Sequence, residues 1–410
     1  MTMRLTFRLA VVFMMLQPAL VLAQSSSSFA SAMRIDEASL SGLISNPIIQ
    51  SFDVSPDGAN VALLVASSVR KEAPLYLVTQ DVATKRVITF RQFRHLTLVY
   101  GNFAPQVRFA SDGRFLVVQD FKTIQVLDRK TLEPLRAISP PVGKEPLIPL
   151  FITGASNMDV FVCAFGLEPR QDFHFHATSV EVEVVDVSSG QRLGEWSSGD
   201  VPQAISPNGD LIAVSSLQPQ QGVLPLDVVD VQGRKVAELT GGFAFKEGDP
   251  LKPLGRVLGV FVGNEELLLT PDENVDQSGH HAGDSLQLVG IAGKQPQIRQ
   301  SIKPRHYAPQ GDLAVSANGR IAASVSWYVP ARLLAREGAL PASSPELLVF
   351  ERSTSLKLDA TLPIHGLGLR VSGWLENRRP RVSSDGSVLA IAQDSGVTVL
   401  TRNPPPSQQP

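Results

Sequence analysis

The sequence predicts an all-β protein in which seven similar four-stranded antiparallel sheets close into a ring, and three observations predict it. A short apolar run, a tight turn and a second apolar run recur five times, first as "SFDVSPDGANVALLVAS". The spacing of the copies fits a repeat of about 50 residues, which is typical of propellers and solenoids. A further pair of apolar runs around a small polar turn follows most copies. Four short strands per repeat therefore predict a seven-bladed β-propeller.

The first hairpin of each repeat turns on a glycine that follows Asp or Asn. The five clear copies have Gly58, Gly113, Gly209, Gly319 and Gly386 at this position. Asp-Gly and Asn-Gly accept the positive φ that tight hairpins require. Two of the gaps between these glycines are roughly twice the repeat length. We therefore expect degenerate copies around Asn157, in "LFITGASNMDVFVCAF", and around Asn264, in "GVFVGNEELLLT".

The second hairpin of each repeat turns on an acidic or small polar residue. Its clearest copies are "IQVLDRKTLEPLRAI", "VEVVDVSSGQRLGEW" and "LDVVDVQGRKVAEL". Asp128, Asp186 and Asp230 lie at the end of the third run, where an aspartate can accept hydrogen bonds from the following backbone and shape the turn. These residues predict the third and fourth strands of each blade.

The last repeat ends one strand short. Its third strand is "GVTVLTRN", and the "PPPSQQP" that follows cannot continue a sheet. Because a ring must mask its sheet edges, we expect a segment within residues 33–44 to supply the missing outer strand. The alternative is that residues 24–46 form a loose linker. The predicted organisation is a leader at 1–23, a Ser-rich linker with the closing strand at 24–46, the propeller at 47–402 and a disordered Pro-rich tail at 403–410.

The N-terminus predicts export. Arg4 and Arg8 precede an apolar run, Pro18 ends it, and Val21-Leu22-Ala23 offers a cleavage site; Ala30-Ser31-Ala32 offers a second. The apolar run is shorter than the ~20 residues that a membrane-spanning helix needs, although an uncleaved anchor is the alternative. No later segment is long and apolar enough to span, so we expect a periplasmic or secreted protein.

Composition excludes some classes of function. The formal net charge is −2, which argues against a nucleic-acid partner because such proteins need a strongly basic surface. Cys163 is the single cysteine, so the chain forms no internal disulfide, and its place in "DVFVCAFG" indicates a buried core residue. The oligomeric state has no signal in the sequence.

The repeated [SA]-x-[DN]-G hairpin and the apolar–apolar–Asp turn resemble the repeats of YVTN-type and TolB-like propellers, which share their architecture with WD-repeat proteins. The resemblance covers roughly residues 48–402. It departs from true WD repeats, because no Trp-Asp pair ends any third strand. The resemblance implies the fold, and it leaves the function open because such propellers include scaffolds, receptors and enzymes.

The connections between strands predict a working face. Turns between the first and second strands and between the third and fourth strands share one rim and are short. The other rim receives long loops such as "RQFRHLTLVYGNFAP" and "PIHGLGLRVSGWLENRRP". Long loops are usually functional. All seven histidines fall in these loops: His95, His174, His176, His280, His281, His306 and His365.

Two of these loops carry candidate metal ligands. In "QDFHFHA", an extended chain would place Asp172, His174 and His176 on one face. The loop "TPDENVDQSGHHAGD" supplies Asp272, Asp276, His280 and His281. Imidazole and carboxylate groups suit a divalent metal, whereas solvated polar loops are the alternative interpretation.

Arginine and aromatic residues form the candidate binding set. Arginines beside tryptophan suit carboxylate or phosphate recognition and are enriched at protein interfaces. The alternatives are a solvated cationic loop and, for "WYVPARLLAREGALP", an insertion packed on its own blade. The candidates are Arg91, Arg94, His95, Trp327, Tyr328, Arg370, Trp374, Arg378 and Arg379.

Two functions follow from these patterns. The favoured hypothesis is an exported propeller that binds a protein partner or a small ligand on its long-loop rim, without catalysis. The alternative is a lactonase-like hydrolase in which a divalent metal in the central channel polarises a carbonyl and activates water. No G-x-S-x-G, P-loop or dinucleotide fingerprint occurs in the sequence.

Overall fold

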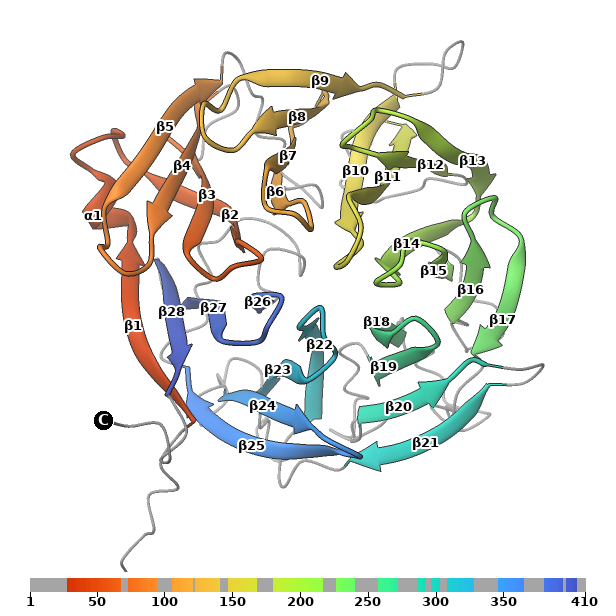
Figure 1. Cartoon of the computed structure of the whole chain (residues 1–410). Helices are drawn as coiled ribbons and strands as arrows, with labels where there is room; N and C mark the ends of the chain where they lie inside the picture. The colour runs from red at the N-terminus through yellow and green to blue at the C-terminus, as the bar shows by residue number, and fades with distance from the viewer. Residues whose placement is uncertain are drawn as a thin grey trace, which may run out of the picture.

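The predicted fold class is confirmed. The computed structural model describes residues 28–67, 73–93, 105–120, 122–140, 147–167, 180–216, 226–239, 257–271, 286–292, 296–302, 308–327, 346–364, 380–393 and 396–403. Within these ranges the chain forms seven four-stranded antiparallel sheets arranged around a central axis (Figure 1).

Blades 1 to 6 each use four consecutive strands, numbered from the axis outward. Blade 1 consists of β2 (Ile48–Val54), β3 (Asn60–Ala66), β4 (Leu75–Asp81) and β5 (Val87–Phe93). Blade 2 consists of β6 (Gln106–Phe109), β7 (Phe115–Gln119), β8 (Ile124–Asp128) and β9 (Pro134–Ile138). Blade 3 consists of β10 (Leu147–Gly154), β11 (Val160–Leu167), β12 (Val180–Asp186) and β13 (Arg192–Ser198).

The same order continues around the ring. Blade 4 consists of β14 (Asp200–Ile205), β15 (Leu211–Ser216), β16 (Leu226–Asp230) and β17 (Lys235–Leu239). Blade 5 consists of β18 (Val257–Gly263), β19 (Glu266–Pro271), β20 (Leu286–Gly290) and β21 (Gln297–Ile302). Blade 6 consists of β22 (Ala308–Val315), β23 (Ile321–Trp327), β24 (Glu346–Arg352) and β25 (Leu356–Pro363). The two degenerate copies expected around Asn157 and Asn264 are therefore real blades.

Blade 7 is completed by the N-terminal strand, as expected. It consists of β26 (Arg381–Val382), β27 (Val388–Gln393), β28 (Gly396–Arg402) and the outer strand β1 (Phe29–Asp36). The closing strand begins and ends earlier than the expected range of 33–44, because Phe29, Met33 and Ile35 are its buried residues. The helix α1 (Glu37–Leu40) then follows at once.

The core lies between neighbouring blades and not within one central mass. Each of the seven blade interfaces holds its own cluster of buried apolar side chains. Middle strands are buried on both faces, so β3 is buried throughout its length. Cys163 on β11 belongs to the cluster between blades 2 and 3, and burial raises the pKa of its thiol, which agrees with a core role. Every blade thus depends on both neighbours for its apolar contacts.

The hairpin motif has a specific structural role. In blade 6 the Ser316 hydroxyl donates to Asn318 Oδ1 at 2.7 Å and accepts from the Ile321 amide at 2.9 Å, while Asn318 Oδ1 accepts from the Arg320 amide. Ser55, Ser206 and Ser383 make the same pair of hydrogen bonds in blades 1, 4 and 7. The network closes the turn and places the following glycine at positive φ.

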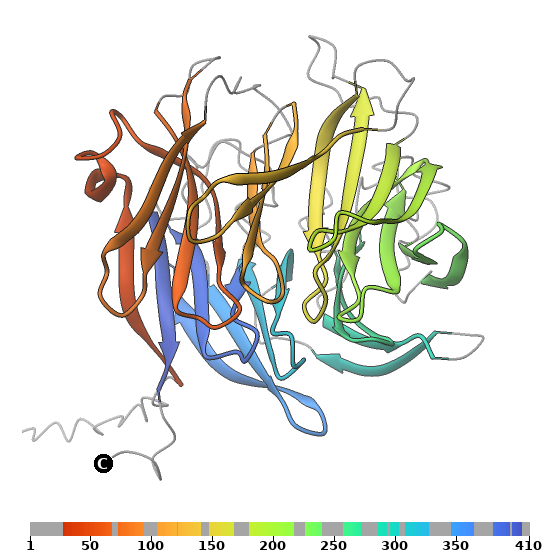
Figure 2. The same cartoon turned by 45° about the horizontal axis from the view of Figure 1, so that its top comes forward.

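Neighbouring first turns are also joined to one another. The Ser384 amide donates to the Pro56 carbonyl at 2.9 Å, which links blade 7 to blade 1. The Asn318 amide donates to the Ser384 carbonyl at 3.2 Å, and the Asn157 amide donates to the Pro207 carbonyl at 3.0 Å. The turns gather at one rim of the disc (Figure 2). We call this side the turn rim.

The opposite rim is where the long connections begin and end. At this rim β11 ends and β12 begins, and likewise β19 ends and β20 begins. Each of these pairs is antiparallel, and the opposite ends of its strands lie at the turn rim. We call this side the loop rim. No helix among the residues described is long and apolar enough to cross a membrane.

The closing strand should carry a large share of the stability of blade 7. Ile35 is fully buried against residues of blades 7 and 1, so Ile35→Ala should lower the free energy of unfolding by about 2–5 kcal/mol through lost contacts and a cavity. Urea unfolding measures this value. The exposed Ser31→Ala in the same strand is the control, and equal stability of the two variants would contradict the role of β1.

The hydroxyl group of Ser316 should contribute more to the free energy of unfolding than the hydroxyl group of an exposed serine. Ser316→Ala leaves the buried Ile321 amide without its acceptor, and such a loss costs about 1–3 kcal/mol. Urea unfolding of this variant can be compared with Ser353→Ala, an exposed serine in another turn of the same blade. We expect Ser353→Ala to match the unmodified chain; an equal loss in both would disprove the assigned role of Ser316.

Candidate functional site

Most of the predicted site residues lie outside the described residues. Of the binding candidates, these are Arg94, His95, Tyr328, Arg370, Trp374, Arg378 and Arg379. Of the metal candidates, they are Asp172, His174, His176, Asp272, Asp276, His280 and His281. Trp327 is the last residue of β23, which ends at the loop rim. The roles of all these residues stay predictions.

Arg91 is the one predicted site residue whose side chain is described. It lies on β5, the outermost strand of blade 1, and its guanidinium donates to the Leu132 carbonyl. It also forms an ion pair with Glu133 at 3.4 Å and lies 5.8 Å from the centre of the Phe93 ring. These contacts join the outer strand of blade 1 to a turn of blade 2, at a distance from the axis.

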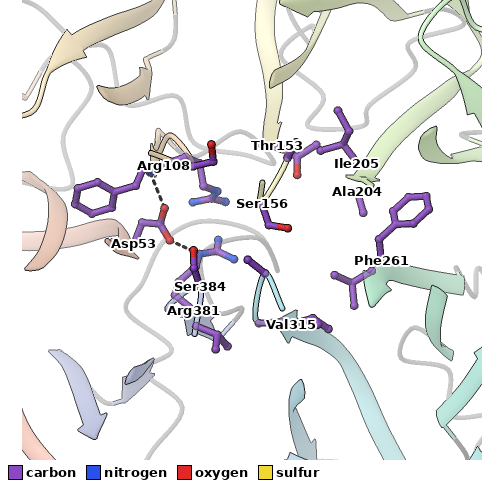
Figure 3. Close-up of a pocket in the computed structure, with 18 of the residues that line it drawn as sticks. Asp53, Arg108, Thr153, Ser156, Ala204, Ile205, Phe261, Val315, Arg381 and Ser384 are labelled. Atoms are coloured by element: carbon purple, nitrogen blue, oxygen red, sulfur yellow. Dashed lines mark hydrogen bonds and ion pairs between the residues drawn. The ribbon is translucent and has the colours of Figure 1, made fainter. Parts of the chain in front are cut away.

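The structure contains a different candidate site at the axis. A cavity of about 200 Å3 lies at the turn-rim end of the central channel, and all seven innermost strands contribute to its wall. Its charged side chains are Asp53, Arg108 and Arg381, which come from blades 1, 2 and 7 (Figure 3). We call this space the channel cavity.

The three charged residues occupy equivalent positions in their blades. Each lies two residues before the first residue of the hairpin turn: Ser55, Ala110 or Ser383. Each of these turn residues donates its amide to the carbonyl five residues later, which fixes the equivalence. The corresponding residues of blades 3, 4 and 6 are Thr153, Ala204 and Ala314. One register position therefore points into the channel from successive blades, and three of its occupants are charged.

Asp53 joins three blades. Its Oδ2 accepts from the Phe109 amide of blade 2 at 2.7 Å, and its Oδ1 lies 3.8 Å from Arg381 Nε of blade 7. Burial raises the pKa of the Asp53 carboxyl above its usual range, against the opposing effects of Arg108, Arg381 and the Phe109 amide. Asp53 is thus a buried acceptor that joins the backbone of blade 2 to Arg381 of blade 7.

Both arginines are held in place by oxygen acceptors. Arg108 donates to the Val107 carbonyl at 2.8 Å and to Gln106 Oε1 at 3.1 Å, and the residue is 9% exposed. Arg381 Nε donates to the Phe52 carbonyl at 3.4 Å, and its side chain is 12% exposed. Neutral carbonyl and amide oxygens thus accept hydrogen bonds from both guanidinium groups, and Arg381 also lies beside the Asp53 carboxylate.

The other side of the channel cavity is apolar. Blades 4, 5 and 6 contribute the apolar residues Ala204, Ile205, Phe261 and Val315 to the lining. Ile205 and Phe261 also belong to the apolar clusters between blades 3 and 4 and between blades 4 and 5. Serine hydroxyls, such as those of Ser111 and Ser156, lie at the mouth on the turn rim. The described lining has no His or Cys.

The sequence held a signal for this cavity. In the aligned hairpins the residue two positions before the turn is apolar in "QAISPNG" and "LAVSANG", but charged in "FDVSPDG", "VRFASDG" and "RVSSDG". A charged residue at one position of a core-forming repeat is a strong indication of function or of a buried pair. This signal lies in the innermost strands and not in the long loops.

The comparisons with known proteins concern the architecture. No family model matches the sequence, and no curated protein matches it. The similar solved structures include a chain of the mitotic checkpoint complex, with a TM-score of 0.52 and 13% identity over 98% of this chain and 99% of that chain. A chain of hydrazine synthase from Kuenenia stuttgartiensis has a TM-score of 0.53 and 14% identity, over 88% of this chain and 97% of that chain. At these identities the likeness shows the fold alone: a WD-repeat-like seven-bladed β-propeller.

Proposed function

We propose that this chain is an exported scaffold or binding protein that recognises a protein partner or a small ligand on its loop rim, without catalysis. The interacting residues would be drawn from Arg94, His95, Trp327, Tyr328, Arg370, Trp374, Arg378 and Arg379. The YVTN-type and TolB-like resemblance is compatible with this role, because propellers of this kind include scaffolds and receptors.

One observation carries the proposal, namely the difference between the two rims. At the turn rim, the described motif side chains are engaged within their own turns, as Ser316 and Asn318 are in blade 6. All the connections that contain histidine begin and end at strand termini on the other rim. A rigid disc that collects its long connections on one side provides the arrangement on which binding loops usually occur.

The position of the closing strand supports one of the two predicted cleavage sites. A leader cleaved after Ala23 would leave β1 (Phe29–Asp36) whole. A cut after Ala32 would remove Phe29 and half of the strand that masks the edge of blade 7. The need for β1 therefore supports the first of the two cleavage sites.

The hydrolase alternative gains no support from the part of the chain that the structure describes. There, no group of three or more His, Cys, Asp and Glu side chains could hold a metal ion. The residues proposed as metal ligands lie in the connections of blades 3 and 5, outside the described ranges.

Processing should produce a mature chain that begins at Gln24. The full chain, expressed with its own leader in a bacterium, should be recovered from the periplasm or the medium with the mass of residues 24–410. Intact mass spectrometry measures this, and Ala23→Arg should block the cleavage as a control. A mature chain that begins at Met33, or an uncleaved chain in the membrane, would contradict the prediction.

Charge reversal on the loop rim should abolish partner recognition. Arg378→Glu combined with Arg379→Glu and Trp374→Ala should reduce captured partner at least tenfold in cross-linking from the native envelope and medium fractions, because arginine and tryptophan dominate interface energies. The matched control is Lys130→Glu with Lys357→Glu, two exposed lysines away from the loop rim. Equal capture by the rim variant and the unmodified chain would refute the assignment.

A further inference from the structure

We propose that the outer edge of blade 3 is a pH-sensitive device, in which Glu183, Arg192 and Glu195 hold β13 against β12 more firmly in mild acid than at neutral pH. Glu183 lies on the third strand, β12, and the other two residues lie on the outermost strand, β13. We call these three residues the blade 3 charge cluster. Acid would thus strengthen this edge, although the protonation of paired carboxylates usually weakens a fold.

Two carboxylates share one cation in the blade 3 charge cluster. Glu183 and Glu195 are directly opposite each other in the β12–β13 ladder. Arg192 Nη1 donates to Glu195 Oε2 at 2.6 Å, while Arg192 Nη2 lies 2.9 Å from Glu183 Oε1. Within the described ranges, Glu183 Oε1 has no hydrogen-bond partner, so its contact with Arg192 is an ion pair alone. The hydrogen bond of the arginine therefore goes to Glu195.

Glu183 is the buried member of the cluster. Its side chain is 2% exposed, against 40% for Glu195 and 48% for Arg192. Burial raises the pKa of the Glu183 carboxyl to about 6; Arg192 opposes this rise and Glu195 adds to it. At neutral pH the carboxylate is therefore ionised in surroundings that favour its neutral form.

Groups on the neighbouring strands complete the surroundings of Glu183. On β11, Cys163 is directly opposite, and burial raises the pKa of its thiol, so the thiol stays neutral in mild acid. On β12, Glu181 lies on the same face and accepts from the Ser197 hydroxyl at 2.7 Å. On β9 of blade 2, Arg136 places its guanidinium beside the turn between β12 and β13 and is charged throughout this range. Because Glu181 is also a carboxyl group, the test has to single out Glu183.

The direction of the pH effect follows from the linkage between protonation and strand pairing. When β13 separates from β12, Glu183 loses Glu195 and gains water, so its pKa returns toward the ordinary value of 4.5. The paired state therefore holds the proton more tightly than the open state. The stability that this group contributes to the pairing is fully present below about pH 4.5, and it is lost as the pH rises through about 6.

Blade 4 repeats the arrangement. Asp227 on β16 is directly opposite Glu238 on β17, and it lies three residues before the aspartate of the second hairpin turn, as Glu183 does in blade 3. Lys235 Nζ lies 3.0 Å from Asp227 Oδ2 and donates to Glu238 Oε2 at 2.6 Å. Burial also raises the pKa of the Asp227 carboxyl. Blade 4 thus supplies a matched cluster for comparison on a different outer strand.

Hydrogen–deuterium exchange of the full chain, read by mass spectrometry of peptides that cover residues 192–198, tests the proposal. After correction for the intrinsic pH dependence of exchange, the equilibrium constant for opening of β13 should fall roughly tenfold between about pH 7.5 and about pH 4.5. Glu183→Gln should abolish this change, because glutamine has a similar size and does not ionise. Asp227→Asn is the matched control and should leave the pH dependence of β13 intact.

Two further variants have opposite expected effects. Arg192→Gln removes the cation and should move the transition to higher pH, whereas Glu195→Gln removes the like charge and should move it to lower pH. Glu195→Gln also serves if Glu183→Gln fails to fold, and thermal unfolding verifies folding. A purely structural cluster would alter protection equally at every pH. Protection of β13 that does not change with pH, or the same change in Glu183→Gln and the unmodified chain, would overturn the proposal.

Discussion

The structure depends on the burial of both faces of every blade against its neighbours. Each of the seven interfaces holds a cluster of apolar side chains, such as that of Leu64, Leu75 and Leu116 between blades 1 and 2. A sheet with two apolar faces must be covered on both faces, and here the neighbouring sheets cover it, so the row of blades closes into a ring. The ring and the N-terminal closing strand are consequences of this one requirement.

Closure also accounts for the polar features near the axis. The innermost strands are sheet edges, and their amides face the next blade. Asp53 accepts from the Phe109 amide, Ser51 from the Val107 amide and Gln203 from the Gly259 amide. Side chains of one blade thus satisfy the backbone of the next, as buried backbone groups require. Where such an acceptor is a carboxylate, as in Asp53, a compensating cation is expected beside it. Blades 2 and 7 each supply an arginine near Asp53.

The two rims differ in how they are built. Hydrogen bonds within and between the turns stiffen the turn rim around most of the ring, and this rim surrounds the mouth of the channel cavity. The loop rim receives the connections whose length can vary without disturbing a blade. A rim of long loops suits a larger partner.

The sequence by itself determined the blade number, the hairpin turns and the origin of the closing strand, because each follows from local patterns of apolar residues, glycine and aspartate. It also indicated the rim on which the histidines fall, since strand order alone decides on which side a connection lies. Only the tertiary structure decided that Asp53, Arg108 and Arg381 meet in one cavity, because these residues are far apart in the chain and come together when blade 7 packs against blade 1. Likewise, the limits of β1 depended on which of Phe29, Met33 and Ile35 found apolar partners in blades 6, 7 and 1, and such contacts exist only once the ring has closed.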